Sequence, residues 1–393
     1  MSQILVWNAD GEEQERNPMP DYTGCVKPSW VPTDGGDAPL SAWPPILREV
    51  ETNLSRKIVL MERLHLGSNP VIRIQYEDGE ENVARTFVRN HLNREEDIQT
   101  IFRRFRREIH LMEWLKANDS AIPGPTIIYP RNISPEMRVT FVILDKLPGE
   151  LVVNVFGRLP YLAKARLVLE HADKMLALFR LSVPQRIGSP ICGSGGTVMD
   201  VGPWCPADHK YAPTKVFNTL EEWISDMIQT KARILEHAED TTPSERSDND
   251  RVLARLTTAL SALCTRFSLP SYRRCVLNHD ELYPTKILVS AHGALTGIVD
   301  WEYTSIRPAL LAAQYPSYLR YDHAREWYVV NPQEAQSLRD LYRAAVELKD
   351  PEYWEALVDG ENLRYAVELL THDTFGYHHL ETWMDATFSR EKM

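Results

Sequence analysis

The stretch at residues 275–304, with the sequence CVLNHDELYPTKILVSAHGALTGIVDWEYT, constrains the fold more than any other part of the chain. A short apolar run leads into a polar loop that ends at Lys286. Two apolar strands follow with a His-Gly turn between them, and Asp300 comes directly after the second strand. This pattern predicts a β-hairpin with acidic groups at both ends. Carboxylates placed in this way suit a hard cation such as Mg²⁺, with substrate phosphates completing its coordination shell.

The loop before the hairpin carries three groups that can exchange a proton, His279, Asp280 and Glu281. A lone histidine is more often a structural residue than a general base, so the two carboxylates are the stronger candidates for catalysis. Asp300 is the strongest candidate for a metal ligand, because a strand end holds its carboxylate firmly and still leaves it open to solvent. Glu302 fits a bracing role better than a catalytic one.

These residues resemble the catalytic centre of the aminoglycoside phosphotransferase-like kinases, a family related to choline kinases and protein kinases. The family pattern is His-x-Asp-Leu, three or four residues, Asn-Ile-Leu, a hairpin and Ile-Asp-Trp-Glu. The chain follows this framework at residues 279–289 and 298–302. From about residue 57 to 330 it is similar to fungal-type members. The resemblance implies phosphorylation of a small hydroxylated metabolite, with ATP and Mg²⁺ as the cofactors.

Two positions depart from the family pattern. Glu281 stands where the family has its catalytic Asp, and Lys286 stands where the family has the Asn that binds metal. Glu281 keeps a carboxylate on a longer side chain, and a misplacement of about 1 Å can lower a rate roughly a hundredfold. Lys286 removes an oxygen ligand and adds a positive charge beside Asp300. It can pair with Asp300 in place of a metal, or contact a phosphate directly.

The resemblance implies an α+β, bilobal, protein-kinase-like fold. A proline-rich extension at residues 1–56 is expected to dock in part on the body. Residues 57–147 then form a small lobe with an antiparallel sheet and one helix, and residues 148–393 form a mainly helical lobe. The period-two alternation at residues 72–77, followed by Asp78-Gly79, predicts a strand and a hairpin turn.

The small lobe also holds the residues that the resemblance assigns to the nucleotide. Arg85 on a strand and Glu108 on the helix at 95–117 take the places of the family's Lys–Glu ion pair, which holds the phosphates. A purely structural ion pair, or two unrelated surface residues, is the alternative. Ser68 and Asn69 are what remains of a glycine-rich phosphate turn, and backbone groups from Leu144 to Leu147 would meet the adenine.

Helical spacing predicts helices at residues 161–181, 217–237 and 247–268, and at about 309–320, 332–348, 352–371 and 376–390. In the first of these helices, the apolar stripe that is expected in the core comprises Leu162, Ala165, Leu169, Ala172, Leu176 and Phe179. Residues 187–205, rich in Gly and Ser, are interpreted as a surface loop. The arginines at 103, 104, 106 and 107 fit a solvated helix face better than an anion-binding patch.

Composition and charge exclude some classes of binding partner and indicate the cellular compartment. The formal net charge of −11 argues against non-specific binding to nucleic acid. No apolar run is long enough to cross a membrane, and the N-terminus lacks the features of a signal peptide. The five cysteines form no CxxC pair, which favours a reducing, cytoplasmic setting. The small-molecule substrate is what the family resemblance implies, and the oligomeric state is open.

The sequence leaves three functions open. The first is ATP-dependent phosphorylation of a small hydroxylated metabolite. The second is a pseudokinase that binds a ligand or a partner without phosphoryl transfer. The third is a kinase fold used for another reaction on a metabolite, with Asp280, Glu281 or His279 as acid or base.

Overall fold

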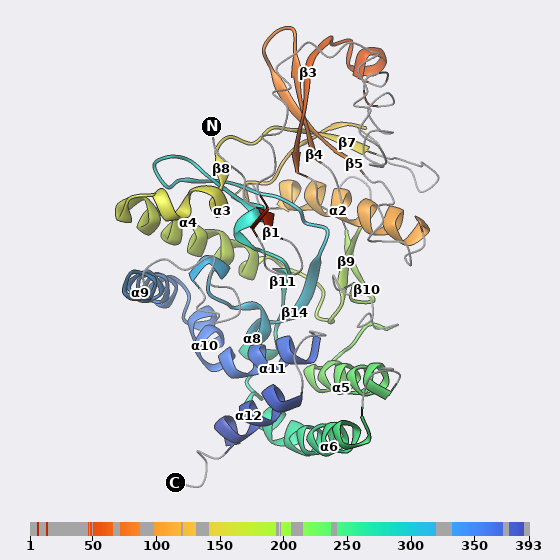
Figure 1. The fold of residues 1–393 in the computed structure, drawn as a ribbon, viewed down its shortest axis with the longest axis vertical. Helices are drawn as coiled ribbons and strands as arrows, with labels where there is room; N and C mark the ends of the chain where they lie inside the picture. The colour runs from red at the N-terminus through yellow and green to blue at the C-terminus, as the bar shows by residue number, and fades with distance from the viewer. Residues whose placement is uncertain are drawn as a thin grey trace. The chain divides into compact units, whose positions relative to one another are not determined.

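The structure, a computed structural model, describes most of the chain beyond residue 50 in two compact units (Figure 1). The first unit comprises residues 1–103 and 126–146, and the second comprises residues 104–125 and 147–393. The described residues are 6–7, 13–14, 46, 48, 50–65, 71–86, 98–118, 121–130, 141–193, 196, 198–205, 215–236, 242–319, 332–371 and 377–388.

The first unit is built on a five-stranded antiparallel sheet with the strand order β3-β4-β5-β7-β6. The predicted hairpin between the second and third of these strands is present, and Gly79 in its turn has a φ of +84°. Side chains of β4 alternate between buried and half-buried, as the sequence pattern predicts. The strands are β3 (Ile58–His65), β4 (Val71–Tyr76), β5 (Glu81–Thr86), β6 (Ile127–Tyr129) and β7 (Phe141–Asp145).

The core of this unit lies on one face of the sheet. Ile46 and Val50, which precede the sheet in the chain, are fully buried against Ile72, Ile74 and other strand residues. A single π-helical turn, η2 (Val50–Leu54), leads from them into β3. Before residue 46 the structure describes only a small pair of strands, β1 (Val6–Trp7) and β2 (Glu13–Gln14). The predicted docking of the remaining extension lies outside the described residues.

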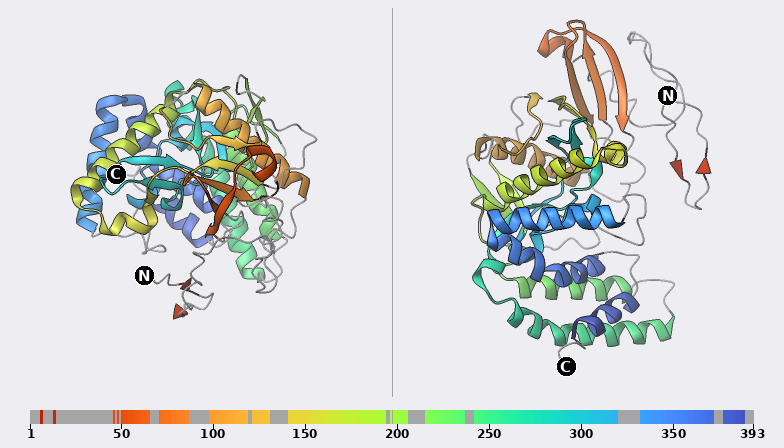
Figure 2. Two further views of the ribbon diagram at one scale, coloured as in Figure 1. Left: turned by 90° about the horizontal axis from the view of Figure 1, so that it is seen from above. Right: turned by 90° about the vertical axis from the view of Figure 1, so that its left-hand side faces the viewer.

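The second unit is mainly helical. Its helices lie in successive layers, with α4 beside α9, α5 beside α11, and α6 beside α12 (Figure 2). The helices are α2 (Ile98–Asn118), whose larger part belongs here, α3 (Val152–Val155), α4 (Tyr161–Arg180), α5 (Leu220–Glu236), α6 (Pro243–Arg266), α7 (Pro270–Arg273), α8 (Ala309–Ala312), α9 (Pro332–Lys349), α10 (Pro351–Asp359), α11 (Glu361–Thr371) and α12 (Tyr377–Phe388). Most of the predicted helices are therefore present with altered ends, but the helix expected at residues 309–320 is wrong beyond Ala312, where α8 ends and a separate 3₁₀ turn follows at Ser317–Leu319.

One predicted helix is divided in two. The apolar spacing at residues 352–371 predicts a single helix, whereas α10 ends before Gly360 and α11 starts after it. A Cβ atom at Gly360 would collide with the backbone oxygens of Leu310 and Ala356. The chain can pass this close to α8 only because residue 360 has no side chain.

Short strands between the helices carry the loop and hairpin of residues 275–304. Strand β11 (Cys275–His279) pairs antiparallel with β14 (Thr304–Pro308). Strand β12 (Ile287–Val289) pairs with β13 (Leu295–Ile298) and also with β8 (Glu150–Leu151). The predicted hairpin is thus present, and its turn at Gly293, with a φ of +78°, packs directly on the backbone of Ala163.

Two interpretations of the sequence are wrong. Leu162 is 81% exposed and Leu169 is also exposed, although both belong to the stripe expected in the core; the stripe's Ala172, Leu176 and Phe179 are buried as expected. The segment expected to be a surface loop contains an antiparallel hairpin, β9 (Ser189–Cys192) and β10 (Met199–Gly202). Five of the eight residues in these two strands are buried, although the strands are too short to give a periodic signal.

None of the helices in the described part of the chain is both long enough and apolar enough to cross a membrane.

Candidate active site

Both ends of the loop at residues 280–286 are held by strands. Strand β11 delivers the chain to His279, and the backbone N–H of Asp280 donates to the carbonyl of Tyr303 at 2.9 Å. At the other end, the backbone N–H of Val299 donates to the carbonyl of Lys286 at 2.9 Å. A 3₁₀ turn, η6 (Pro284–Lys286), closes the loop. The side chains of this loop are therefore presented from a fixed backbone.

His279 lies inside this framework, as a structural residue would. It is 2% exposed, its Nε2 lies 3.2 Å from the carbonyl oxygen of Val299, and its ring centroid lies 4.9 Å from that of Trp301. Burial lowers the pKa of His279 to about 4. The ring is therefore neutral at pH 7 and, with a proton on Nε2, donates to Val299. These contacts join the start of the loop to the end of the hairpin.

Asp280 is enclosed by hydrogen-bond donors. Its Oδ1 accepts from Asn278 at 2.8 Å, from Ser305 at 2.6 Å and from the Arg307 guanidinium at 2.6 Å. Its Oδ2 accepts from the indole N–H of Trp204 at 3.1 Å. Four donors hold this carboxylate in one orientation. Of the two loop carboxylates that the sequence offers for catalysis, this one has both oxygens engaged within the protein.

Glu281 differs from its neighbour. The structure assigns no hydrogen bond to its carboxylate from any residue that it describes, and the side chain is half-buried. Burial raises the pKa of the Glu281 carboxyl, and the charges of Glu302 and Asp280 add to this effect. The ammonium of Lys286 opposes it, so desolvation outweighs an attractive charge. A carboxylate with a raised pKa is a stronger base, which suits a group that must take a proton from a hydroxyl.

Lys286 and Asp300 form an ion pair across the base of the hairpin. Their side chains are 22% and 19% exposed, so the pair is partly shielded from water. Asp300 has a φ of +68°, a left-handed conformation that Asp tolerates better than most residues. The sequence left two roles open for Lys286, pairing with Asp300 or contact with a phosphate, and the first is the one that the structure contains.

The donor set fits a Mg²⁺ site poorly. A cation bound to Asp300 would have to displace the Lys286 ammonium, and Lys286 offers no oxygen ligand. No group of three or more His, Cys, Asp or Glu side chains within the described ranges is arranged to hold a metal. Asp300 as a metal ligand therefore stays a prediction that these contacts do not favour.

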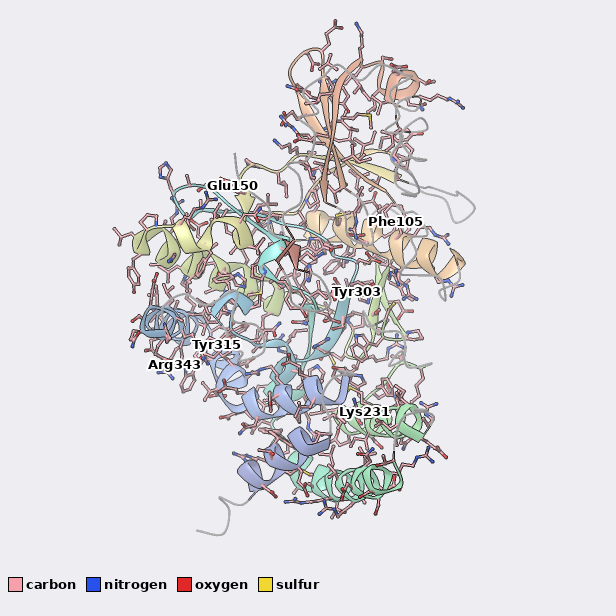
Figure 3. The ribbon with its side chains drawn as sticks, in the orientation of Figure 1. Phe105, Glu150, Lys231, Tyr303, Tyr315 and Arg343 are labelled. Carbon is pink, nitrogen blue, oxygen red and sulfur yellow. The ribbon has the colours of Figure 1, made fainter. Side chains whose placement is uncertain are left out.

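A buried ion pair lies behind the loop. Arg104 on α2 pairs with Glu302, and both side chains are only 5% exposed. The Arg104 guanidinium also lies 5.3 Å from the ring centroid of Tyr303, which is labelled in Figure 3 just before β14. The expectation of a solvated face is thus wrong for Arg104. The bracing role expected of Glu302 fits this contact.

The other predicted residues lie elsewhere. Arg85 is buried on β5 in the first unit, and Glu108 is buried on α2 in the second. Leu144 is buried at the end of β7, and Leu147 is half-buried in the second unit. Ser68 and Asn69 lie outside the described residues. The nucleotide roles of these six residues stay predictions.

Sequence reasoning missed the residues that surround Asp280. Trp204 follows β10, and Arg307 lies on β14, where it also donates from Nε to Ser305 at 2.7 Å. The signal that could have found Arg307 was its alternation with Ser305 on a strand that follows the Asp-Trp-Glu motif. Nothing in the local sequence points to Trp204.

Comparison with known proteins agrees with this architecture. The chain is 35% identical over 353 residues to the clavilactone A biosynthesis cluster protein Y of Ampulloclitocybe clavipes, and the match covers 86% of each chain. Its fold is similar to that of aminoglycoside phosphotransferase APH(2'')-IIa solved with gentamicin, with a TM-score of 0.52, 12% identity, and coverage of 91% of this chain and 96% of the other.

A second solved structure, aminoglycoside phosphotransferase APH(2'')-Ib with ADP bound, has a TM-score of 0.51 and 10% identity, and covers 86% of this chain and 96% of its own. No family model matches the chain. The chain belongs to the same family as the clavilactone A biosynthesis cluster protein Y, and it has the kinase-like fold of the aminoglycoside phosphotransferases.

The neutral state of His279 predicts a loss of stability in acid. The folded pKa is about 4 and the ordinary value is 6.5, so the unfolded chain takes up the proton first as the pH falls. The contribution is fully present above pH 6.5 and declines by about 1.4 kcal/mol per pH unit towards pH 4. In urea titrations across this window, His279→Gln should reduce the slope by that amount, and the share of buried His171, whose pKa burial lowers to about 3, should remain. His292→Gln, at an exposed position, should leave it unchanged, and equal slopes in all three proteins would contradict the assignment.

The Arg104–Glu302 pair predicts a strongly non-additive mutant cycle. Glu302→Gln leaves a buried guanidinium without its counter-ion and should cost about 3–5 kcal/mol in the free energy of unfolding. Arg104→Met should cost a similar amount, whereas the double variant Arg104→Met/Glu302→Leu should cost less than either alone. The exposed pair Arg343–Asp340 is the control, and Asp340→Asn should cost under about 1 kcal/mol. Additive costs at Arg104 and Glu302 would refute a coupled pair.

Proposed function

We propose that this chain is an enzyme of small-molecule biosynthesis that phosphorylates a hydroxyl group of a metabolite, with Glu281 as the proton acceptor. The observation that carries the proposal is the difference in surroundings between the two carboxylates of the loop at residues 280–286. Of the two loop carboxylates, Asp280 is held by four donors, and Glu281 has no hydrogen bond from the described residues and a raised pKa.

In the proposed reaction, the Glu281 carboxylate takes the proton of the acceptor hydroxyl as the hydroxyl oxygen bonds to phosphorus. ATP, when bound, supplies the γ-phosphoryl group and leaves as ADP. The fixed backbone of residues 280–286 orients Glu281 for this step. No step is assigned to Mg²⁺, because the Lys286–Asp300 ion pair takes up the carboxylate that would bind it.

Two comparisons support a metabolite as the substrate. The solved structures with this fold are phosphotransferases that act on small molecules, and the relative at 35% identity is named for a biosynthesis cluster. The identity of the acceptor is left open by these likenesses. For the nucleotide we propose the residues that the sequence predicts, Arg85 and Glu108 for the phosphates, with Ser68 and Asn69, and Leu144 to Leu147 for the adenine.

The Lys286–Asp300 pair favours a second candidate function. A site whose metal position is filled by an ammonium can still exchange protons through Glu281 without transferring phosphate. The chain would then transform a hydroxylated metabolite, or bind one as a pseudokinase does, without turnover of ATP. Both candidates place the metabolite hydroxyl at Glu281, and they differ in whether the chain binds ATP and whether metal matters.

Calorimetric titration of ATP, with Mg²⁺ and with EDTA, separates the two candidates. For the phosphotransferase we expect binding whose Kd changes less than about threefold between the two conditions, because Lys286 already supplies the positive charge. In Lys286→Asn/Glu281→Asp, which restores the family residues, Mg²⁺ should tighten binding at least about tenfold. Lys349→Asn is the matched control, since Lys349 pairs with Asp173 on the exposed surface.

The remaining outcomes are equally informative. No binding of ATP by the parent at millimolar concentration would reject phosphoryl transfer and leave the second candidate. Tight, Mg²⁺-dependent binding in the parent that the double variant loses would show that Lys286 serves the metal site and does not replace the metal.

A further inference from the structure

We propose that Asp280 and Arg307 are positioning residues that hold Glu281 in its partly dehydrated place on the loop. The inference rests on the proposed function, because Glu281 matters most if it takes the substrate proton. It assigns to Asp280 a part in catalysis that is exerted through its neighbour and not through proton transfer of its own.

The contacts of Asp280 tie three separate parts of the chain together. Its carboxylate bonds to Asn278 on β11, to Ser305 and Arg307 on β14, and to Trp204 after β10. The side chains of Asp280 and Arg307 are 11% and 14% exposed, so this ion pair is more deeply shielded than the Lys286–Asp300 pair. Each oxygen of Asp280 is satisfied, which makes a second orientation of the side chain costly.

Arg307 is itself fixed from several sides. Its Nε donates to Ser305, its terminal nitrogen pairs with Asp280, and its guanidinium lies 5.9 Å from the ring centroid of Trp204 and 5.6 Å from that of Trp223. The two tryptophan rings are perpendicular, with centroids 5.3 Å apart. The planar Arg307 guanidinium donates hydrogen bonds and lies near the two tryptophan rings at the same time, which a lysine ammonium cannot do.

Glu281 is therefore placed between two restrained neighbours. Asp280 precedes it, and the carbonyl of Leu282 after it accepts a hydrogen bond from Ser317 at 2.7 Å. The carbonyl of Glu281 accepts from the backbone N–H of Tyr283 at 2.7 Å. With the backbone held on both sides, the Glu281 side chain stays half-buried although no donor among the described residues binds its carboxylate. If Asp280 loses Arg307, the charged group among its four donors, this end of the loop is loosened and Glu281 can turn into water.

The test measures the protonation of Glu281 without any substrate. A water-soluble carbodiimide adds to a protonated carboxyl group, an added amine displaces the urea to leave a stable amide, and this amide is located by mass spectrometry of the peptide that contains Glu281. The pH midpoint of this labelling reports the pKa of Glu281. It is compared in the parent, in Arg307→Met and in Arg307→Lys, with Arg343→Met as a control from an exposed ion pair.

The sign of the shift separates positioning from a direct charge effect. The charged groups around Glu281 are Lys286, Glu302, Asp280 and Arg104. Removal of the Arg307 charge would, through electrostatics alone, raise the midpoint, whereas release of Glu281 into water lowers it. We expect a fall of about one pH unit in Arg307→Met, a smaller fall in Arg307→Lys, and no change in Arg343→Met.

A midpoint that rises or stays unchanged in folded Arg307→Met would overturn the proposal. If that variant does not fold, Arg307→Lys decides, since it keeps the charge and loses the fork, and a parental midpoint there would overturn the proposal too. The outcome is independent of the proposed function. A fall of the midpoint in a protein that binds no ATP would keep the positioning role and reject only phosphoryl transfer.

Discussion

The antiparallel pairing of β11 with β14 is the constraint on which the rest of the site depends. It sets His279 opposite Thr304 and Asn278 opposite Ser305, so the start of the loop and the end of the hairpin share one ladder of hydrogen bonds. From this register follow the contact of Asp280 with Tyr303, the contact of His279 with Val299 and the closure of Arg307 on Asp280. A slip of one residue would turn each of these side chains to the opposite face.

Charge around the loop is balanced pair by pair. Asp280 pairs with Arg307, Asp300 with Lys286, and Glu302 with Arg104. Each pair reduces the free-energy cost of removing two charges from water. A carboxylate paired in this way is not available to bind a metal or a substrate. Glu281 has no such pair among the described residues, and burial raises its pKa in spite of nearby Lys286. Glu281 is therefore the candidate base of this site.

The loop and hairpin could be predicted because their signals are local. The spacing from His279 to Asp300, the alternation on the strands and the His-Gly turn all lie within residues 275–304, and the structure follows them closely. Helices with strong apolar spacing were equally accessible. The exposure of Leu162 and Leu169 on α4 could not be predicted, because both are apolar and lie at helical spacing from Leu176, which is buried.

The partners of the site residues could not be predicted, because they come from distant parts of the sequence. Glu302 meets Arg104 across 198 residues, and Asp280 meets Trp204 across 76. Arg104 was one of four neighbouring arginines with nothing local to distinguish it, and its burial depends on how α2 packs in the second unit. Trp204 follows a hairpin whose strands are too short to show a period. Tertiary packing decided these contacts.

The central claim is that the Lys286 ammonium takes the place of a metal at Asp300. Anomalous X-ray diffraction from crystals soaked with Mn²⁺ and ATP tests this claim most directly, because Mn²⁺ accepts the same oxygen ligands as Mg²⁺ and identifies itself by its scattering. The account predicts no manganese peak on the Asp300 carboxylate of the parent, and a peak there in Lys286→Asn. A manganese ion bound to Asp300 in the parent, with Lys286 moved aside, would contradict it.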